Sequence, residues 1–116
     1  MIKAKLKAMW SIDHDLKTYI PEDKNEFYIT LNLPIGSSKT DGADYFDLFV
    51  CSPEWLCKHQ WEPEILRHTL VVRKYDLDEI TETINKYIEK CTCKTWEETA
   101  QKLSRYFAWE FEDYSD

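Results

Sequence analysis

Cysteine and histidine are the side chains in this sequence that could form a nucleophile and its base. Cys51 and Cys57 are followed by His59 and His68, and a cysteine activated by a histidine is a common nucleophile in hydrolases. Such a pair needs the imidazole within hydrogen-bond reach of the thiol and a third group that orients the imidazole. The sequence shows neither requirement. We therefore expect a buried thiol at a strand end and imidazoles near the surface.

The cysteines could also bind a metal ion or form disulfides. Their spacings are C-x5-C for Cys51 and Cys57 and C-x-C for Cys91 and Cys93, whereas zinc ligands are usually separated by about two to four residues. Cysteines of cytosolic proteins are usually reduced and pack as small apolar side chains. We expect four reduced cysteines and no metal or other cofactor.

Acidic residues gather around a loop that contains both glycines of the chain. Asp41, Asp44 and Asp47 lie close together, but the period and the glycine placement of a calcium loop are missing. The loop at 36–42 also lacks the glycine spacing and the following helix that bind phosphate. These features indicate a hairpin loop with solvated carboxylates.

The elements that would position these residues follow from hydrophobic periodicity. Residues 2–10 alternate apolar side chains with lysines, which predicts a strand with one wet face. Residues 26–35 and 44–51 are rich in aromatic and β-branched side chains and flank the loop at 36–42, which predicts a hairpin. Ser52 followed by Pro53 predicts the start of a short helix.

The second half of the sequence predicts one strand and two helices. Residues 68–75 are expected to form the strand, and Asp76 with Glu79 is a capping pattern before apolar residues at helical spacing. Thr95 and Glu98 form a second capping box. The order of elements predicts an α+β fold: an antiparallel sheet of about four strands with two C-terminal amphipathic helices on one face. With no repeat or linker, residues 1–116 are expected to form a single domain.

Charge excludes some classes of partner. The net charge is −7, and residues 76–116 carry 11 acidic but only 5 basic side chains. This field repels nucleic acid and anionic membranes and favours encounters with cationic surfaces. No apolar run is long enough to span a bilayer, and the alternating start does not resemble a signal peptide. We expect a cytoplasmic protein that binds neither nucleic acid nor membrane.

Aromatic residues point to a protein interface. Five tryptophans and seven tyrosines exceed what a core of this size easily holds, because each buried indole N–H or phenol O–H requires a partner. Aromatic anchors beside acids suit protein binding. The aromatic residues of the C-terminal segment could instead pack in the core. Its acidic residues could instead form an ordinary solvated tail. The candidate partner-binding residues are Trp109, Glu110, Glu112, Asp113, Tyr114, Asp116, Asp41 and Asp44.

Four segments resemble the immunity protein 8 family. They are SRYFAWEFEDY at 104–114, VCSPEWL at 50–56, RHTLVV at 67–72 and TWEE at 95–98. The segments occur in the family's order, and the resemblance extends over essentially the whole chain. Cys57, Cys91 and Cys93 look like local features of this sequence.

The resemblance implies a function without catalysis. Members of the family are encoded beside bacterial polymorphic toxins and protect the producing cell by binding the toxin domain. The resemblance therefore implies a cytoplasmic antitoxin whose partner is a cognate toxin domain. Two other interpretations stay open: a protein-binding adaptor or regulatory module without a toxin, and a small hydrolase that uses two carboxylates in a deep pocket.

Overall fold

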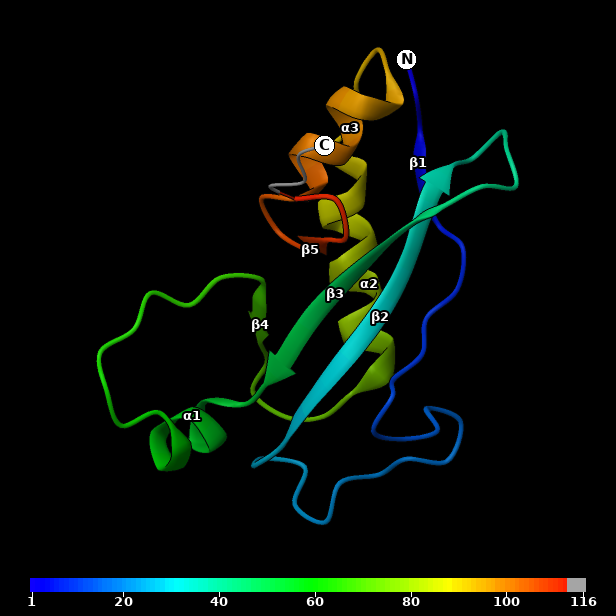
Figure 1. The fold of residues 1–116 in the computed structure, drawn as a ribbon. Helices are drawn as coiled ribbons and strands as arrows, with labels where there is room; N and C mark the ends of the chain where they lie inside the picture. The colour runs from blue at the N-terminus through cyan, green and yellow to red at the C-terminus, as the bar shows by residue number, and fades with distance from the viewer. Residues whose placement is uncertain (113–116) are drawn as a thin grey trace.

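Two long strands, β2 (Tyr28–Ser37) and β3 (Asp44–Cys51), form an antiparallel hairpin at the centre of the fold (Figure 1). The computed structural model describes residues 1–112. Three shorter strands complete the sheet within these residues, and three helices are interspersed with the strands along the chain. The remaining elements are β1 (Ala4–Leu6), α1 (Pro53–His59), β4 (Thr69–Val71), α2 (Leu77–Glu89), α3 (Trp96–Leu103) and β5 (Ala108–Trp109).

The register of the hairpin separates a buried face from an open face. Successive side chains of a strand point to opposite faces, and Leu31 pairs with Leu48 while Leu33 pairs with Phe46, all four of them buried. Burial of each such side chain is worth about 1.5–3 kcal/mol. The alternation in the sequence therefore decides which face of the hairpin meets the core.

β3 is paired along both edges. β2 runs along one edge, while β5 and β4 share the other: Phe46 is in register with Trp109, and Val50 with Leu70. The predicted α+β class is confirmed, but the sheet is mixed, because β4 is parallel to β3. The expected antiparallel order fails here because α1 and the loop at 60–68 carry the chain back to the start of β4. A parallel pair requires such a long crossover.

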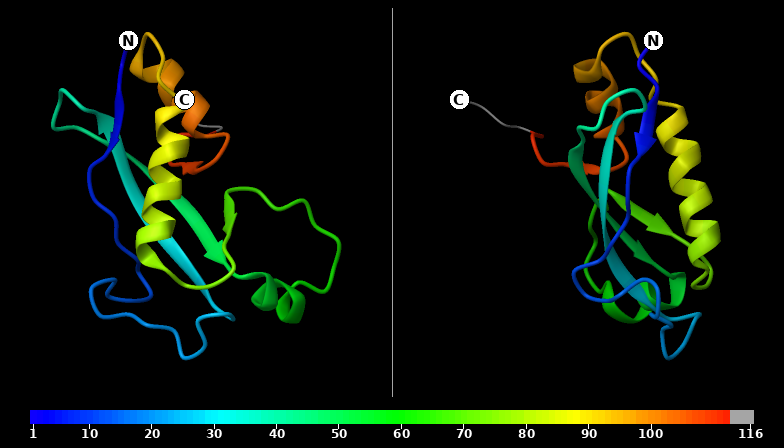
Figure 2. Two further views of the ribbon diagram at one scale, coloured as in Figure 1. Left: turned by 180° about the vertical axis from the view of Figure 1, so that it is seen from behind. Right: turned by 90° about the vertical axis from the view of Figure 1, so that its right-hand side faces the viewer.

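The predicted helix starts are confirmed. Asp76 accepts hydrogen bonds from the backbone N–H groups of Asp78 and Glu79, and Thr95 accepts one from Glu98. α2 lies along one face of the sheet (Figure 2), where it buries three isoleucines at helical spacing. α3 lies beyond its C-terminal end, beside the N-terminus (Figure 1), and adds buried residues to the same core cluster. The isoleucines are Ile80, Ile84 and Ile88.

The predicted first strand is shorter than its sequence pattern. Only Ala4–Leu6 is paired as a strand, while Ile2 and Trp10 each form an isolated bridge, to Cys93 and Asn32. No helix within residues 1–112 is long and apolar enough to cross a membrane.

Gly36, near the end of β2, and Gly42, in the turn that follows, make a matched pair for a stability test. A Cβ atom at Gly36 would collide with the backbone carbonyl oxygen of Gly42, whereas a Cβ at Gly42 would meet nothing within 4 Å. We expect Gly36→Ala to lower the free energy of unfolding by about 1–3 kcal/mol. Gly42→Ala should change it by less than about 1 kcal/mol. Urea denaturation of both variants measures the difference, and equal stabilities would contradict this packing.

Candidate partner-binding surfaces

Asp44 binds two tryptophans that are distant from it in the sequence. Its Oδ2 atom accepts hydrogen bonds from the Nε1 atoms of Trp96 and Trp109, each at 3.0 Å. Trp109 also stacks on Phe46, with 6.4 Å between ring centroids. The structure therefore brings together two predicted site residues, Asp44 and Trp109. Their contacts join β3 to β5 and to the start of α3.

The two predicted acids that follow Trp109 are also held within the molecule. Glu110 Oε2 accepts a hydrogen bond from the backbone N–H of Tyr45 at 2.8 Å. Glu112 Oε2 lies 3.1 Å from Arg67 Nη2, and its Oε1 lies 3.6 Å from His68 Nε2. Glu110 remains exposed, and the Glu112 side chain is about one-quarter exposed. Both acids fasten the segment after β5 to its neighbours.

Asp41 is not part of this cluster, because it is exposed in the turn between β2 and β3. Asp113, Tyr114 and Asp116 lie outside the described residues. Their role in partner binding stays a prediction.

The open face of the sheet carries aromatic residues that are not among the partner-binding residues predicted from the sequence. Tyr28, Phe49 and Trp55 form one group, with ring centroids 5.0–5.9 Å apart. Trp10 and Tyr45 form a second group, with centroids 6.3 Å apart. A usable signal was present, since Tyr28, Tyr45 and Phe49 alternate with the core residues of their strands.

The loop between α1 and β4 is the second feature that the sequence did not single out. Within six residues it exposes Trp61 by 83%, Ile65 by 92% and Leu66 by 42%. Isolated exposed apolar residues are normal on protein surfaces, whereas a cluster of them often marks an interaction site. The sequence does contain a hint, since the residues between Gln60 and Arg67 include apolar side chains that follow neither a helical nor a strand period.

Two of the candidate bases, His59 and His68, each place a ring nitrogen beside a backbone carbonyl oxygen. His59 Nδ1 is 2.9 Å from the carbonyl oxygen of Trp55, and His68 Nε2 is 2.8 Å from that of Ser104. Burial raises the pKa of the Cys51 and Cys91 thiols, which disfavours their thiolate forms. No three His, Cys, Asp or Glu side chains of residues 1–112 are grouped so as to hold a metal ion.

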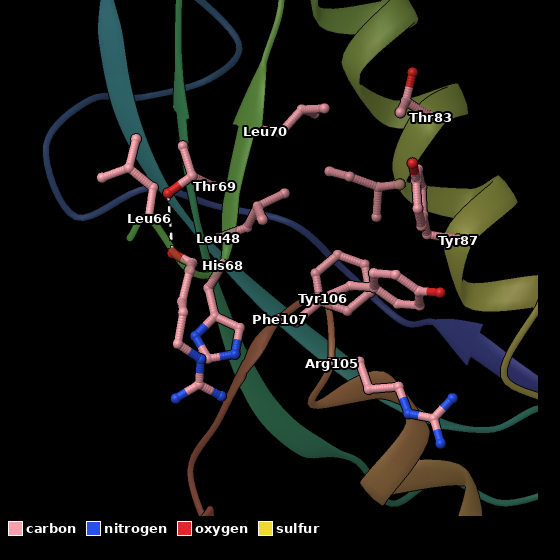
Figure 3. Close-up of a pocket in the computed structure, with 12 residues that line it drawn as sticks. Leu48, Leu66, His68, Thr69, Leu70, Thr83, Tyr87, Arg105, Tyr106 and Phe107 are labelled. Carbon is pink, nitrogen blue, oxygen red and sulfur yellow. Dashed lines mark hydrogen bonds between the residues drawn. The ribbon is translucent and has the colours of Figure 1, made fainter. Parts of the chain in front are cut away.

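A pocket of about 330 Å³ lies between β4, α2 and the turn before β5 (Figure 3). Thr83 and Tyr87 form one wall, Leu66 and Leu70 lie opposite, and Tyr106 lies between the two sides. None of the twelve lining residues is Asp or Glu. The acid–base pair that a carboxylate hydrolase requires is therefore missing from this pocket.

Carboxylates gather instead along an open groove at the start of β2. Glu22, Asp23 and Glu26 line it. Glu22 and Asp23 are exposed, and Glu26 is paired with Lys58. The groove thus holds two solvated carboxylates and one that is engaged in an ion pair.

Comparison with known proteins gives one match. The family model described as Immunity protein 8 matches residues 4–114. No curated protein sequence and no solved structure matches the chain. The family match covers every element of the described fold.

The hydrogen bonds between Asp44 and the two tryptophans can be tested by mutation. Asp44→Ala leaves the indole N–H groups of Trp96 and Trp109 without their acceptor, so we expect the free energy of unfolding to fall by about 1–3 kcal/mol. Asp41→Ala removes an exposed carboxylate from the same hairpin and should have little effect. Thermal and urea denaturation compare the two variants. Equal stabilities would show that the two indoles do not depend on Asp44.

Proposed function

Because the chain belongs to the immunity protein 8 family, we propose that it binds a cognate secreted toxin domain and neutralises it in the cytoplasm of the producing bacterial cell. The match over residues 4–114 is the observation that carries the proposal. The common core formed by the sheet, α2 and α3 supports treating residues 1–116 as one immunity domain.

We propose that neutralisation requires contact alone. The exposed aromatic and aliphatic side chains supply apolar area for a protein interface. The net charge of −7 accelerates encounter with a cationic partner and does not by itself determine how long the complex lasts. If the toxin is a nuclease, its basic substrate groove is the natural target for such a protein.

The acidic C-terminal segment contributes steering in this proposal. Glu110 is exposed although its carboxylate accepts a hydrogen bond from Tyr45, so its charge remains available to an approaching partner. Asp113 and Asp116 add two more charges to the same end of the chain. Charges at the rim of an interface change the association rate more than the dissociation rate.

The central prediction is tight binding to the toxin. Calorimetry with the purified toxin domain encoded beside this gene should give a Kd below about 1 μM, and addition of the protein should abolish the toxin's activity. A toxin domain from an unrelated system, which lacks the matching surface, should not bind. Absence of binding at micromolar concentrations would contradict the proposed function and leave the adaptor interpretation.

A second prediction concerns the rate of association. Glu110→Gln, Asp113→Asn and Asp116→Asn together remove three charges, and the amide introduced at position 110 keeps an oxygen that can accept the Tyr45 N–H. We expect slower association and a weaker dependence of the rate on salt, because less charge attracts the partner. Stopped-flow mixing at several salt concentrations measures both quantities.

A control separates the C-terminal segment from total charge. Glu82, Glu89 and Glu97 are exposed on α2 and α3, so changing all three to Gln removes the same charge elsewhere. This control should slow association less than the C-terminal variant. Equal effects would mean that only the net charge matters.

A further inference from the structure

The loop between α1 and β4 exposes three large apolar side chains. Its side chains at Trp61, Ile65 and Leu66 are exposed by 83%, 92% and 42%, and they lie within six residues. In Figure 1 the loop forms a wide arc on the side of β4 that faces away from the hairpin tip. These side chains contribute nothing to the core cluster, so folding does not explain why they are apolar.

Polar contacts hold both ends of this loop. Gln60 closes α1 through its backbone N–H to the Leu56 carbonyl, and its side chain donates to the Glu62 carbonyl, each at 2.8 Å. At the other end, Arg67 pairs with Glu112. A loop held in this way loses less conformational entropy when it binds.

His68 adds a second observation at the exit of the loop. Its φ angle is +54°, and it is the sole residue with positive φ within the described chain. The conformation is held by two hydrogen bonds: Phe49 N–H donates to the His68 carbonyl at 3.0 Å, and His68 Nε2 contacts the Ser104 carbonyl. Strained backbone that its surroundings hold in place is typical of functional sites.

The loop borders a hollow of about 310 Å³. Phe49 and Trp55 line it together with Ile65 and Leu66 of the loop. Trp55 and Phe49 belong to the aromatic group on the open face of the sheet. The apolar surface of the loop therefore continues onto the sheet.

Charge indicates what this surface would accept. Glu54, Glu62 and Glu64 are exposed in α1 and the loop. The cations of the same stretch, Lys58 and Arg67, are each paired with an acid, Glu26 and Glu112. An apolar centre with an acidic rim is complementary to an apolar hollow bordered by lysine or arginine.

We propose that the α1–β4 loop surface, defined as Trp55, Trp61, Glu62, Glu64, Ile65 and Leu66, is the docking site for a cationic face of the cognate toxin domain. The inference rests on the proposed function and adds the surface that performs it. Trp61 and Ile65 are the anchors, and Glu62 and Glu64 border them. Arg67, His68 and Glu112 are positioning residues that hold the loop.

Two single variants and a control test this proposal. Trp61→Ala and Ile65→Ala remove side chains that are largely exposed, so both proteins should keep the wild-type melting temperature. Each should weaken binding to the purified toxin domain by about 10- to 100-fold. Ile12→Ala is the matched control, because Ile12 is 85% exposed and lies outside the surface; its affinity should equal that of the wild type.

The outcomes separate this inference from the proposed function. If the wild type does not bind the toxin, the proposed function fails. If the wild type binds and both loop variants bind equally well, the docking site is elsewhere and the inference is overturned. Sedimentation of the isolated protein adds a further check: a dimer that Trp61→Ala dissolves would show that a second copy covers the loop, which also overturns the proposal.

Hydrogen exchange supplies a test that needs no mutation. Toxin binding should slow exchange of the backbone amides at 60–68, and the amides of the hairpin turn at 38–42 should be unaffected. Protection confined to the turn or to the C-terminal segment would contradict the proposal. The Glu112→Gln variant, which removes the charge paired with Arg67, should speed exchange at 60–68 in the free protein.

Discussion

β3 forms backbone hydrogen bonds along both of its edges, with β2 on one side and β5 and β4 end to end on the other. This double pairing requires the chain to leave β3, pass through α1 and an exposed loop, and return in the same direction. It also requires the chain after α3 to return to the start of β3 as β5. The positions of the loop and of β5 both follow from how this one strand is paired.

The residues at the two ends of β3 secure this arrangement. Asp44, at the start, accepts the indole N–H groups of Trp96 and Trp109. Ser52, just after the end, is fully buried; its hydroxyl oxygen accepts the backbone N–H groups of Phe27 and Trp55. Buried or half-buried polar groups are stable only when paired. The same groups thereby tie the strand to α1, to α3, to β5 and to the residue before β2.

Local signals predicted the elements well, because their causes are local. The alternation in 26–35 and 44–51 and the capping residues Asp76 and Thr95 act within a few positions of the chain. The direction of β4 was not predictable in this way, since it depends on the path of the whole crossover. The role of Asp44 was hidden as well: its partners are 52 and 65 residues away, and nothing at position 44 indicates them.

The candidate surface was predicted only in part, for a related reason. Aromatic and acidic composition indicated an interface, but composition does not show which apolar residues the core leaves uncovered. Trp109 was selected by its neighbours in sequence, and in the fold it packs on Phe46. Trp61 and Ile65 carry no regular pattern, and their exposure becomes visible only once the core is known.

The separation of the α1–β4 loop from the core has a consequence for how such a protein can diverge. Because Trp61 and Ile65 bury little surface in the folded chain, most substitutions there change stability by less than about 0.5 kcal/mol. Selection can therefore alter the loop rapidly while the residues around β3 stay under separate constraint. In the proposed function, adaptation to a different toxin requires new side chains on this loop and no new fold.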